Sequence, residues 1–149
     1  MQGICNLTWR QAQLLLAIYW RSKTFGRVKA EDLIGDLGVA YSTLFDHISA
    51  LDSNGLVYIP SGKLPRNLSF NDEIELTDKG IKKAKEILAK FGCNDKTPLF
   101  EIFKKLESYL TSLPLSVRRS TGYFLDAKSA ISKVVNRIVS ENPTEPIIS

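Results

Sequence analysis

One stretch of the 149-residue chain decides its fold: Tyr41-Ser42-Thr43-Leu44-Phe45-Asp46-His47-Ile48-Ser49-Ala50-Leu51-Asp52-Ser53-Asn54-Gly55-Leu56-Val57. Leu44, Ile48 and Leu51 recur at spacings of four and three residues, so they share one face of a helix. Asn54 and Gly55 come next, and both residue types adopt the left-handed conformation in which helices commonly end. The stretch therefore predicts an amphipathic helix, a stop and the start of a strand.

Two further helical patterns precede this stretch. The first runs from about Thr8 to Ser22, and Thr8 is placed to cap it, with Gln11 three residues later as in a capping box. The second runs from about Lys29 to Asp36, and Gly38 makes the turn into the third helix. The order helix, helix, turn, helix is thus expected before any strand.

A hairpin pattern follows the third helix. Residues 56–59 are β-branched and aromatic enough for a strand, and residues 60–67 form a loop rich in glycine and proline. Residues 68–70 and 73–76 alternate apolar and polar side chains, which predicts the return strand. The hairpin tip is expected at residues 63–67.

The remainder of the chain is predicted to be helical. Thr77 is the expected N-cap of a fourth helix that Gly92 stops, and residues 93–98 form a linker. A stripe of large apolar residues then starts at Leu99, and a longer helix of about two heptads covers residues 116–141. Residues 142–149 cannot continue that helix and are expected to be a disordered tail.

These patterns resemble the winged helix-turn-helix proteins of the MarR type, with a looser likeness to the PadR type. Three segments carry the resemblance: Val28 to Val39 as the second helix, Ser42 to Val57 as recognition helix and strand entry, and Leu76 to Gly80 as the strand-to-helix junction. The resemblance implies a mainly α fold with a small β-hairpin and a DNA-binding domain over residues 8–91. It also implies a dimer that binds double-stranded DNA.

Two features depart from the family pattern. Between Ala40 and Asn54 there is no Lys or Arg, whereas the family often has basic residues where this chain has Asp46 and Ala50. The family also usually begins with an additional helix for dimerisation, and the seven residues before Thr8 leave no room for one. A homodimer is therefore expected to use a C-terminal region over residues 97–141. Its predicted interface consists of apolar side chains: Leu99, Phe103, Leu106, Phe124, Ile131, Val134 and Ile138.

The outward face of the third helix holds the candidate DNA contacts. Two roles fit Ser42 and Thr43, a helix cap or a phosphate contact. His47 either donates to a base edge or phosphate or is a solvated surface histidine, and Tyr41 either packs under the helix or reaches the DNA backbone. Asp46 would repel phosphate, although a carboxylate accepts from the exocyclic amine of cytosine.

Positive charge near this helix comes from other segments. Lys63 and Arg66 lie in the hairpin loop, and an arginine there suits the negative potential of a minor groove. Arg27 and Lys29 precede the second helix, where they are placed to clamp phosphate. For each of these residues the alternative is a solvated side chain. The lysines of the fourth helix are expected to form a solvated face.

Composition limits the class of protein. The net charge is +4, and it is uneven: residues 1–77 hold 7 basic and 8 acidic side chains, and residues 78–149 hold 13 and 8. No apolar run or signal pattern predicts a membrane segment or secretion, so a cytoplasmic protein is expected. Two distant cysteines predict reduced thiols, with a disulfide as the weaker alternative. One histidine and no CxxC leave little material for a metal site, and no motif predicts an enzyme or a cofactor.

Two functions from different classes fit these observations. The first is a sequence-specific, dimeric DNA-binding protein, most simply a transcriptional regulator, with the third helix in the major groove and the hairpin on the flanking backbone or minor groove. The second is a winged-helix adaptor that contacts another protein in a replication, partition or other nucleoprotein assembly. The weakly acidic first 77 residues and the third helix without Lys or Arg favour the adaptor. The sequence does not predict any effector ligand.

Overall fold

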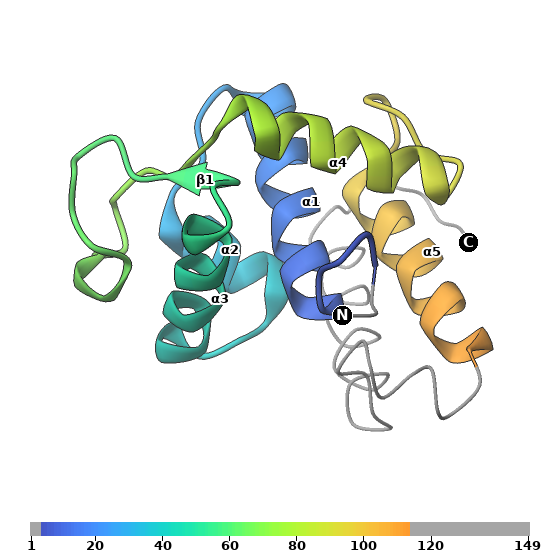
Figure 1. Cartoon of the computed structure of the whole chain (residues 1–149), viewed down its shortest axis with the longest axis horizontal. Helices are drawn as coiled ribbons and strands as arrows, with labels where there is room; N and C mark the ends of the chain where they lie inside the picture. Colours follow the sequence, from blue (N-terminus) through green and yellow to red (C-terminus); the bar gives the residue numbers. More distant parts are fainter. Residues whose placement is uncertain (1–3, 114–149) are drawn as a thin grey trace, which may run out of the picture.

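The computed structural model of the chain describes residues 4–113 (Figure 1). This part is mainly helical, with a small antiparallel sheet of two strands. In chain order the elements are α1 (Trp9–Phe25), α2 (Ala30–Leu37), α3 (Tyr41–Ser53), β1 (Val57–Tyr58), the 3₁₀ turn η1 (Pro65–Asn67), β2 (Glu75–Leu76), α4 (Asp78–Lys90) and α5 (Leu99–Ser112).

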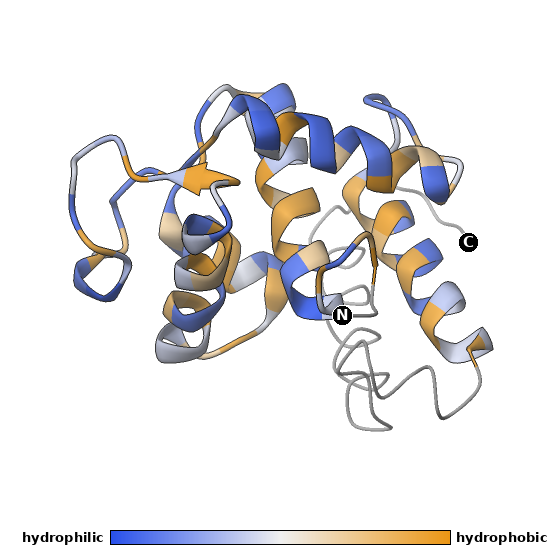
Figure 2. Cartoon of the chain, in the orientation of Figure 1, coloured by the Kyte–Doolittle hydropathy of each residue, from blue (hydrophilic) through white to orange (hydrophobic). Residues whose placement is uncertain are grey.

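Helix α1 is the centre of the hydrophobic core. The predicted capping box is confirmed: the Thr8 side chain accepts from the Gln11 amide, and the Gln11 side chain accepts from the Thr8 amide. The helix ends at Phe25, three residues beyond the predicted Ser22, because Gly26 is the residue that adopts the left-handed conformation (φ 80°). Its middle is buried on all sides, since α2, α3, α4 and α5 all pack on it (Figure 2).

The helix predicted for the stretch that starts at Tyr41 is confirmed as α3. Gly38 turns the chain from α2 into α3 with φ 64°, and α3 ends at Ser53 ahead of Gly55, which has φ 73°. The three side chains that define its apolar face, at positions 44, 48 and 51, are completely buried. The helix is therefore held by burial of one stripe, and its opposite face is free for contacts.

The hairpin is shorter than predicted. Val57 pairs with Leu76 and Tyr58 with Glu75, but the predicted strand at residues 68–70 is wrong. The carbonyl groups of Phe70 and Asp72 instead accept from the amides of residues 31 and 30, which open α2 and would otherwise lack partners. An isolated bridge between Lys29 and Glu73 continues this contact.

Helix α4 begins where the sequence places it. Thr77 caps it by accepting from the Gly80 amide, and the Thr77 hydroxyl donates to the carbonyl of Gly55 (2.6 Å). Lys79 reaches back in the same direction and donates to the carbonyl of Asn54 (3.0 Å). The start of α4 is thus tied to the end of α3 through two side chains.

Helix α5 corrects the predicted dimer interface. Leu99, Phe103 and Leu106 are buried in the same hydrophobic cluster as α1, so they have no surface left for a second subunit. The predicted domain boundary between residues 91 and 97 does not separate two cores. The other predicted interface residues lie outside the described part of the chain: Phe124, Ile131, Val134 and Ile138. Within residues 4–113 no helix is long and apolar enough to cross a bilayer.

Candidate nucleic-acid interface

The exposed surface of α3 consists of a polar stripe. Ser42, Asp46, Ser49 and Ser53 are exposed and follow one another at helical spacing. This stripe therefore presents three hydroxyl groups and one carboxylate, and α3 also exposes a second carboxylate, that of Asp52. The sequence analysis included Ser42 among the DNA contacts but missed Ser49 and Ser53, which a helical wheel centred on the buried stripe would have placed beside it.

One edge of this stripe faces α1. Thr43 and His47 are half-buried, and Arg10 of α1 acts on His47 directly. Burial first, and then repulsion by Arg10, lowers the pKa of His47, whereas Asp46 acts in the opposite direction. His47 is therefore neutral at neutral pH in the free protein.

Arg10 is a residue that the sequence analysis missed. Its Nη1 donates to the side-chain Oε1 of Gln13 (2.8 Å) and to the carbonyl of Leu37 (3.1 Å), at the turn into α3. Its guanidinium also lies 4.3 Å from the centre of the Trp9 ring. Burial lowers the pKa of Arg10 to about 10, so the side chain keeps its charge at neutral pH.

Gln13, which accepts from Arg10, leaves its own side-chain amide nitrogen without a hydrogen bond within residues 4–113. The side chain is completely buried. An unpaired buried donor costs about 1–3 kcal/mol, so the fold gives up stability while Gln13 holds the Arg10 guanidinium.

The opposite edge of α3 carries the wing, which we define as residues 60–72. The Tyr41 hydroxyl donates to the carbonyl of Leu68. The Tyr41 ring lies 4.1 Å from the ring centre of Phe45 and 4.6 Å from that of Phe70. Tyr41 therefore fastens the wing to α3, and a contact of this half-buried residue with DNA stays a prediction.

The wing presents both cations and apolar side chains. Lys63 donates to Asp72 (3.0 Å), and Arg66 is exposed and forms no ion pair within the described residues. The hydrogen bond from the Ser69 amide, and then Lys63, lowers the pKa of the Asp72 carboxyl. Leu64 and Phe70 are about half exposed (52% and 54%). The free positive charge of the wing is thus that of Arg66.

Arg27 and Lys29 lie apart from the polar stripe. Arg27 is exposed, and its guanidinium is 3.9 Å from the carboxylate of Glu73. The backbone of Lys29 bridges the same residue, and its amide donates to Asp32 (3.1 Å). Both residues therefore sit at the base of the hairpin beside acidic neighbours, and the carboxylate of Glu73 partly balances the charge of Arg27.

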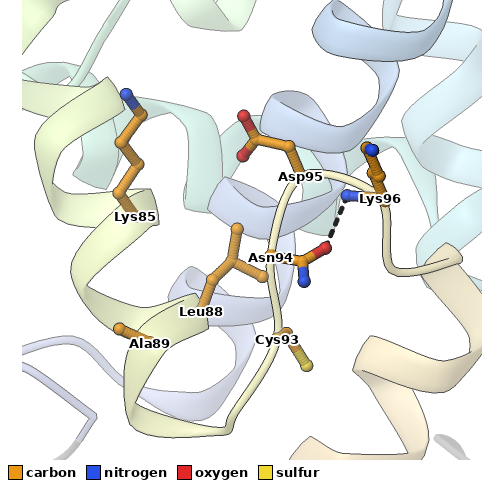
Figure 3. A pocket seen from close by; sticks show the side chains of 7 residues that line it. All are labelled: Lys85, Leu88, Ala89, Cys93, Asn94, Asp95 and Lys96. Atoms are coloured by element: carbon orange, nitrogen blue, oxygen red, sulfur yellow. Dashed lines mark hydrogen bonds between the residues drawn. The ribbon is translucent and has the colours of Figure 1, made fainter.

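A shallow hollow lies between α4 and the connection to α5, away from α3 (Figure 3). Lys85 and Leu88 line it from α4, and Cys93, Asp95 and Lys96 line it from the connection. The Tyr19 hydroxyl donates to Asp95 (2.6 Å). Burial, and then this hydrogen bond, raises the pKa of Tyr19 to about 12. None of the predicted DNA contacts lines this hollow.

In comparisons with protein-family models, curated proteins and solved structures, the chain finds no match. No group of three or more metal-ligating side chains occurs within residues 4–113. A function for the surface of α3 has to be argued from its geometry and charge.

Proposed function

We propose that the chain is a winged-helix protein that binds double-stranded DNA sequence-specifically and regulates transcription. One observation carries the proposal: α3 exposes an uncharged or acidic polar stripe, and cations stand on both of its edges, Arg10 on the α1 side and Arg66 on the wing. This is the distribution that a major groove requires, with base edges in the centre and phosphates on either side.

The order of the elements supports the winged-helix assignment. Helices α2 and α3 meet at the turn of Gly38, and the antiparallel pair β1 and β2 follows α3 directly. An isolated bridge between Lys29 and Glu73 also places the residues just ahead of α2 beside the hairpin. In the proposed complex α3 lies in the major groove, and the wing lies over the neighbouring backbone or minor groove.

The polar stripe suggests how bases are read. Serine hydroxyls donate and accept, so Ser42 and Ser49 suit several base edges, whereas the carboxylate of Asp46 accepts from the amine of cytosine. Few strong base contacts are then available, and phosphate contacts supply most of the affinity. A homodimer would place two such helices about one helical turn of DNA apart. Its interface would involve residues beyond 113.

A second candidate function is a protein adaptor, and one observation favours it. Leu64 and Phe70 of the wing expose apolar surface beside a helix that has no Lys or Arg. An exposed apolar pair rimmed by polar groups is typical of a protein-binding surface.

A salt titration distinguishes the two functions. We expect a labelled mixed-sequence duplex to bind the protein at low salt, with an affinity that falls steeply as salt rises, because binding releases counterions. Arg66→Ala should weaken binding and lower the salt slope by about one. Lys104→Ala is the matched control: it removes one exposed charge from α5, which packs on the side of α1 and not on α3. Absence of binding at low salt would reject the DNA-binding function and leave the adaptor.

A further inference from the structure

Arg10 has one edge of its guanidinium in use and one edge free. Nη1 supplies both hydrogen bonds, to Gln13 and to the carbonyl of Leu37. Nε and Nη2 form no hydrogen bond within the described part of the chain, and the side chain remains partly exposed. The Nε and Nη2 edge is one that can bind two oxygens of a phosphate at once.

The orientation of that edge is set before any ligand arrives. The guanidinium is held by the two hydrogen bonds of Nη1 and by the Trp9 ring, whose centre lies 4.3 Å away. An arginine that is already ordered loses less conformational freedom on binding than a free surface arginine such as Arg66. The fold therefore prepares Arg10 for a contact that the protein itself does not supply.

The neighbour of Arg10 on α3 is His47, whose ring is half-buried beside the polar stripe. The charged groups that act on this ring are Arg10 from α1 and Asp46 from α3. Two cation-forming side chains from different helices are thus placed together at one edge of the candidate interface. In the free protein burial, and then repulsion by Arg10, lowers the pKa of His47.

From this geometry we propose that Arg10 and His47 form a binding site for one backbone phosphate of DNA, and that His47 takes up a proton when the phosphate binds. The proposal rests on the DNA-binding function proposed above. It places one DNA phosphate between α1 and α3, on the side of α3 opposite the wing. The phosphate accepts from the Nε and Nη2 edge of Arg10 and from the protonated His47 ring. The proton comes from solvent, so no other reactant is needed.

The sign of the pH dependence follows from linkage. In the free protein the pKa of His47 is lowered, and a bound phosphate raises it because the negative charge stabilises the imidazolium. Protons are then taken up on binding, and the affinity for DNA rises as the pH falls between the two pKa values. A histidine that only stabilises the fold would leave DNA affinity independent of pH in that range.

The test measures binding of a labelled mixed-sequence duplex by fluorescence anisotropy over a range of salt and from about pH 8 to about pH 6. Arg10→Gln should lower the affinity about tenfold and reduce the salt slope by about one, whereas Lys104→Gln, with the same loss of charge on α5, should change both much less. His47→Gln should remove most of the increase in affinity that the wild-type protein gains on acidification.

Arg10→Lys provides a second variant if Arg10→Gln does not fold, and circular dichroism and thermal melting establish which variants are folded. The lysine keeps the charge but not the two-pronged edge, so we expect weaker binding with the salt slope unchanged. If the wild-type protein binds and folded Arg10 and His47 variants match it in affinity, salt slope and pH dependence, the phosphate site is wrong. If the wild-type protein does not bind at low salt, the proposed function itself fails.

Discussion

Gly80 shows how closely α4 approaches the strand that follows α3. A Cβ atom at this position would lie 2.0 Å from the carbonyl oxygen of Leu56 and 3.0 Å from its carbon, which no side chain tolerates. The Leu56 carbonyl also accepts from the Thr77 amide, so it is fixed in place. The glycine is required by contact with the backbone of Leu56, the residue just before β1, and not by its own conformation.

Gly80→Ala should therefore destabilise the protein by about 3 kcal/mol, because the helix must move away from the strand. Chemical unfolding measures this change in the free energy of unfolding. Gly35→Ala is the control: the new methyl group meets nothing within 4 Å in the middle of α2. That variant should be stabilised by about 0.5–1 kcal/mol, since alanine forms helices better than glycine. Equal effects at the two sites would contradict the close approach.

At the scale of elements, the wing is fastened and not free. Tyr41 binds it through the Leu68 carbonyl and through the Phe70 ring, and the carbonyls of residues 70 and 72 cap α2. The wing therefore connects the first turns of α2 and α3. Because the wing is fixed to α3, Arg66 lies at a defined distance from the polar stripe. In the proposed DNA complex Arg66 would supply a phosphate contact that α3, which has no Lys or Arg, cannot supply.

Tyr41→Phe should loosen this connection while it preserves the ring contacts. We expect a loss of about 1 kcal/mol from the missing hydrogen bond to a buried carbonyl, together with faster amide hydrogen exchange at Asn67 and Leu68. Tyr58→Phe removes a hydroxyl that donates to Glu75 on the surface, and it should leave exchange in the wing unchanged. Unchanged exchange at residues 67 and 68 in the Tyr41 variant would show that the hydroxyl does not hold the wing.

At the scale of the whole molecule, α1 joins two sets of elements into one core. Helices α2 and α3 pack on it with the hairpin beyond them, and α5 packs on it as well (Figure 1). Arg21 strengthens the first contact through two hydrogen bonds to the buried Asp36 (2.5 and 2.8 Å). The surface of α3 is thus supported by a core that extends to residue 110.

Phe103→Ala tests whether α5 belongs to this core or to a subunit interface. Removal of a completely buried ring should cost about 3–5 kcal/mol, and any dependence of the thermal midpoint on protein concentration should be the same in this variant as in the wild-type protein. Phe25→Ala is the control, because that ring is 62% exposed and should contribute much less. A midpoint that rises with concentration in the wild-type protein and loses this dependence in the Phe103 variant would restore α5 to a dimer interface.

The sequence by itself determined the features that depend on near neighbours. Thr8 and Thr77 cap their helices through residues three positions away, and Gly38 and Gly55 end α2 and α3 because their backbones are left-handed. The stripe of Leu44, Ile48 and Leu51 placed the exposed face of α3 correctly by its period alone. Each of these signals acts within about one helical turn, so no distant contact was needed to detect it.

Only the tertiary structure decided what surrounds that face. The segment at residues 68–70 alternates like a strand, yet its Phe70 carbonyl accepts from the amide of Glu31 in the first turn of α2, some forty positions earlier in the chain, and its Leu68 carbonyl accepts from the Tyr41 hydroxyl. The stripe at Leu99, Phe103 and Leu106 shows that one face is apolar but not whether its own chain or a second one covers it. The charge of Arg10 acts on His47 because α1 packs on α3. All three outcomes depend on which surfaces meet in space, and helical period and capping do not determine that.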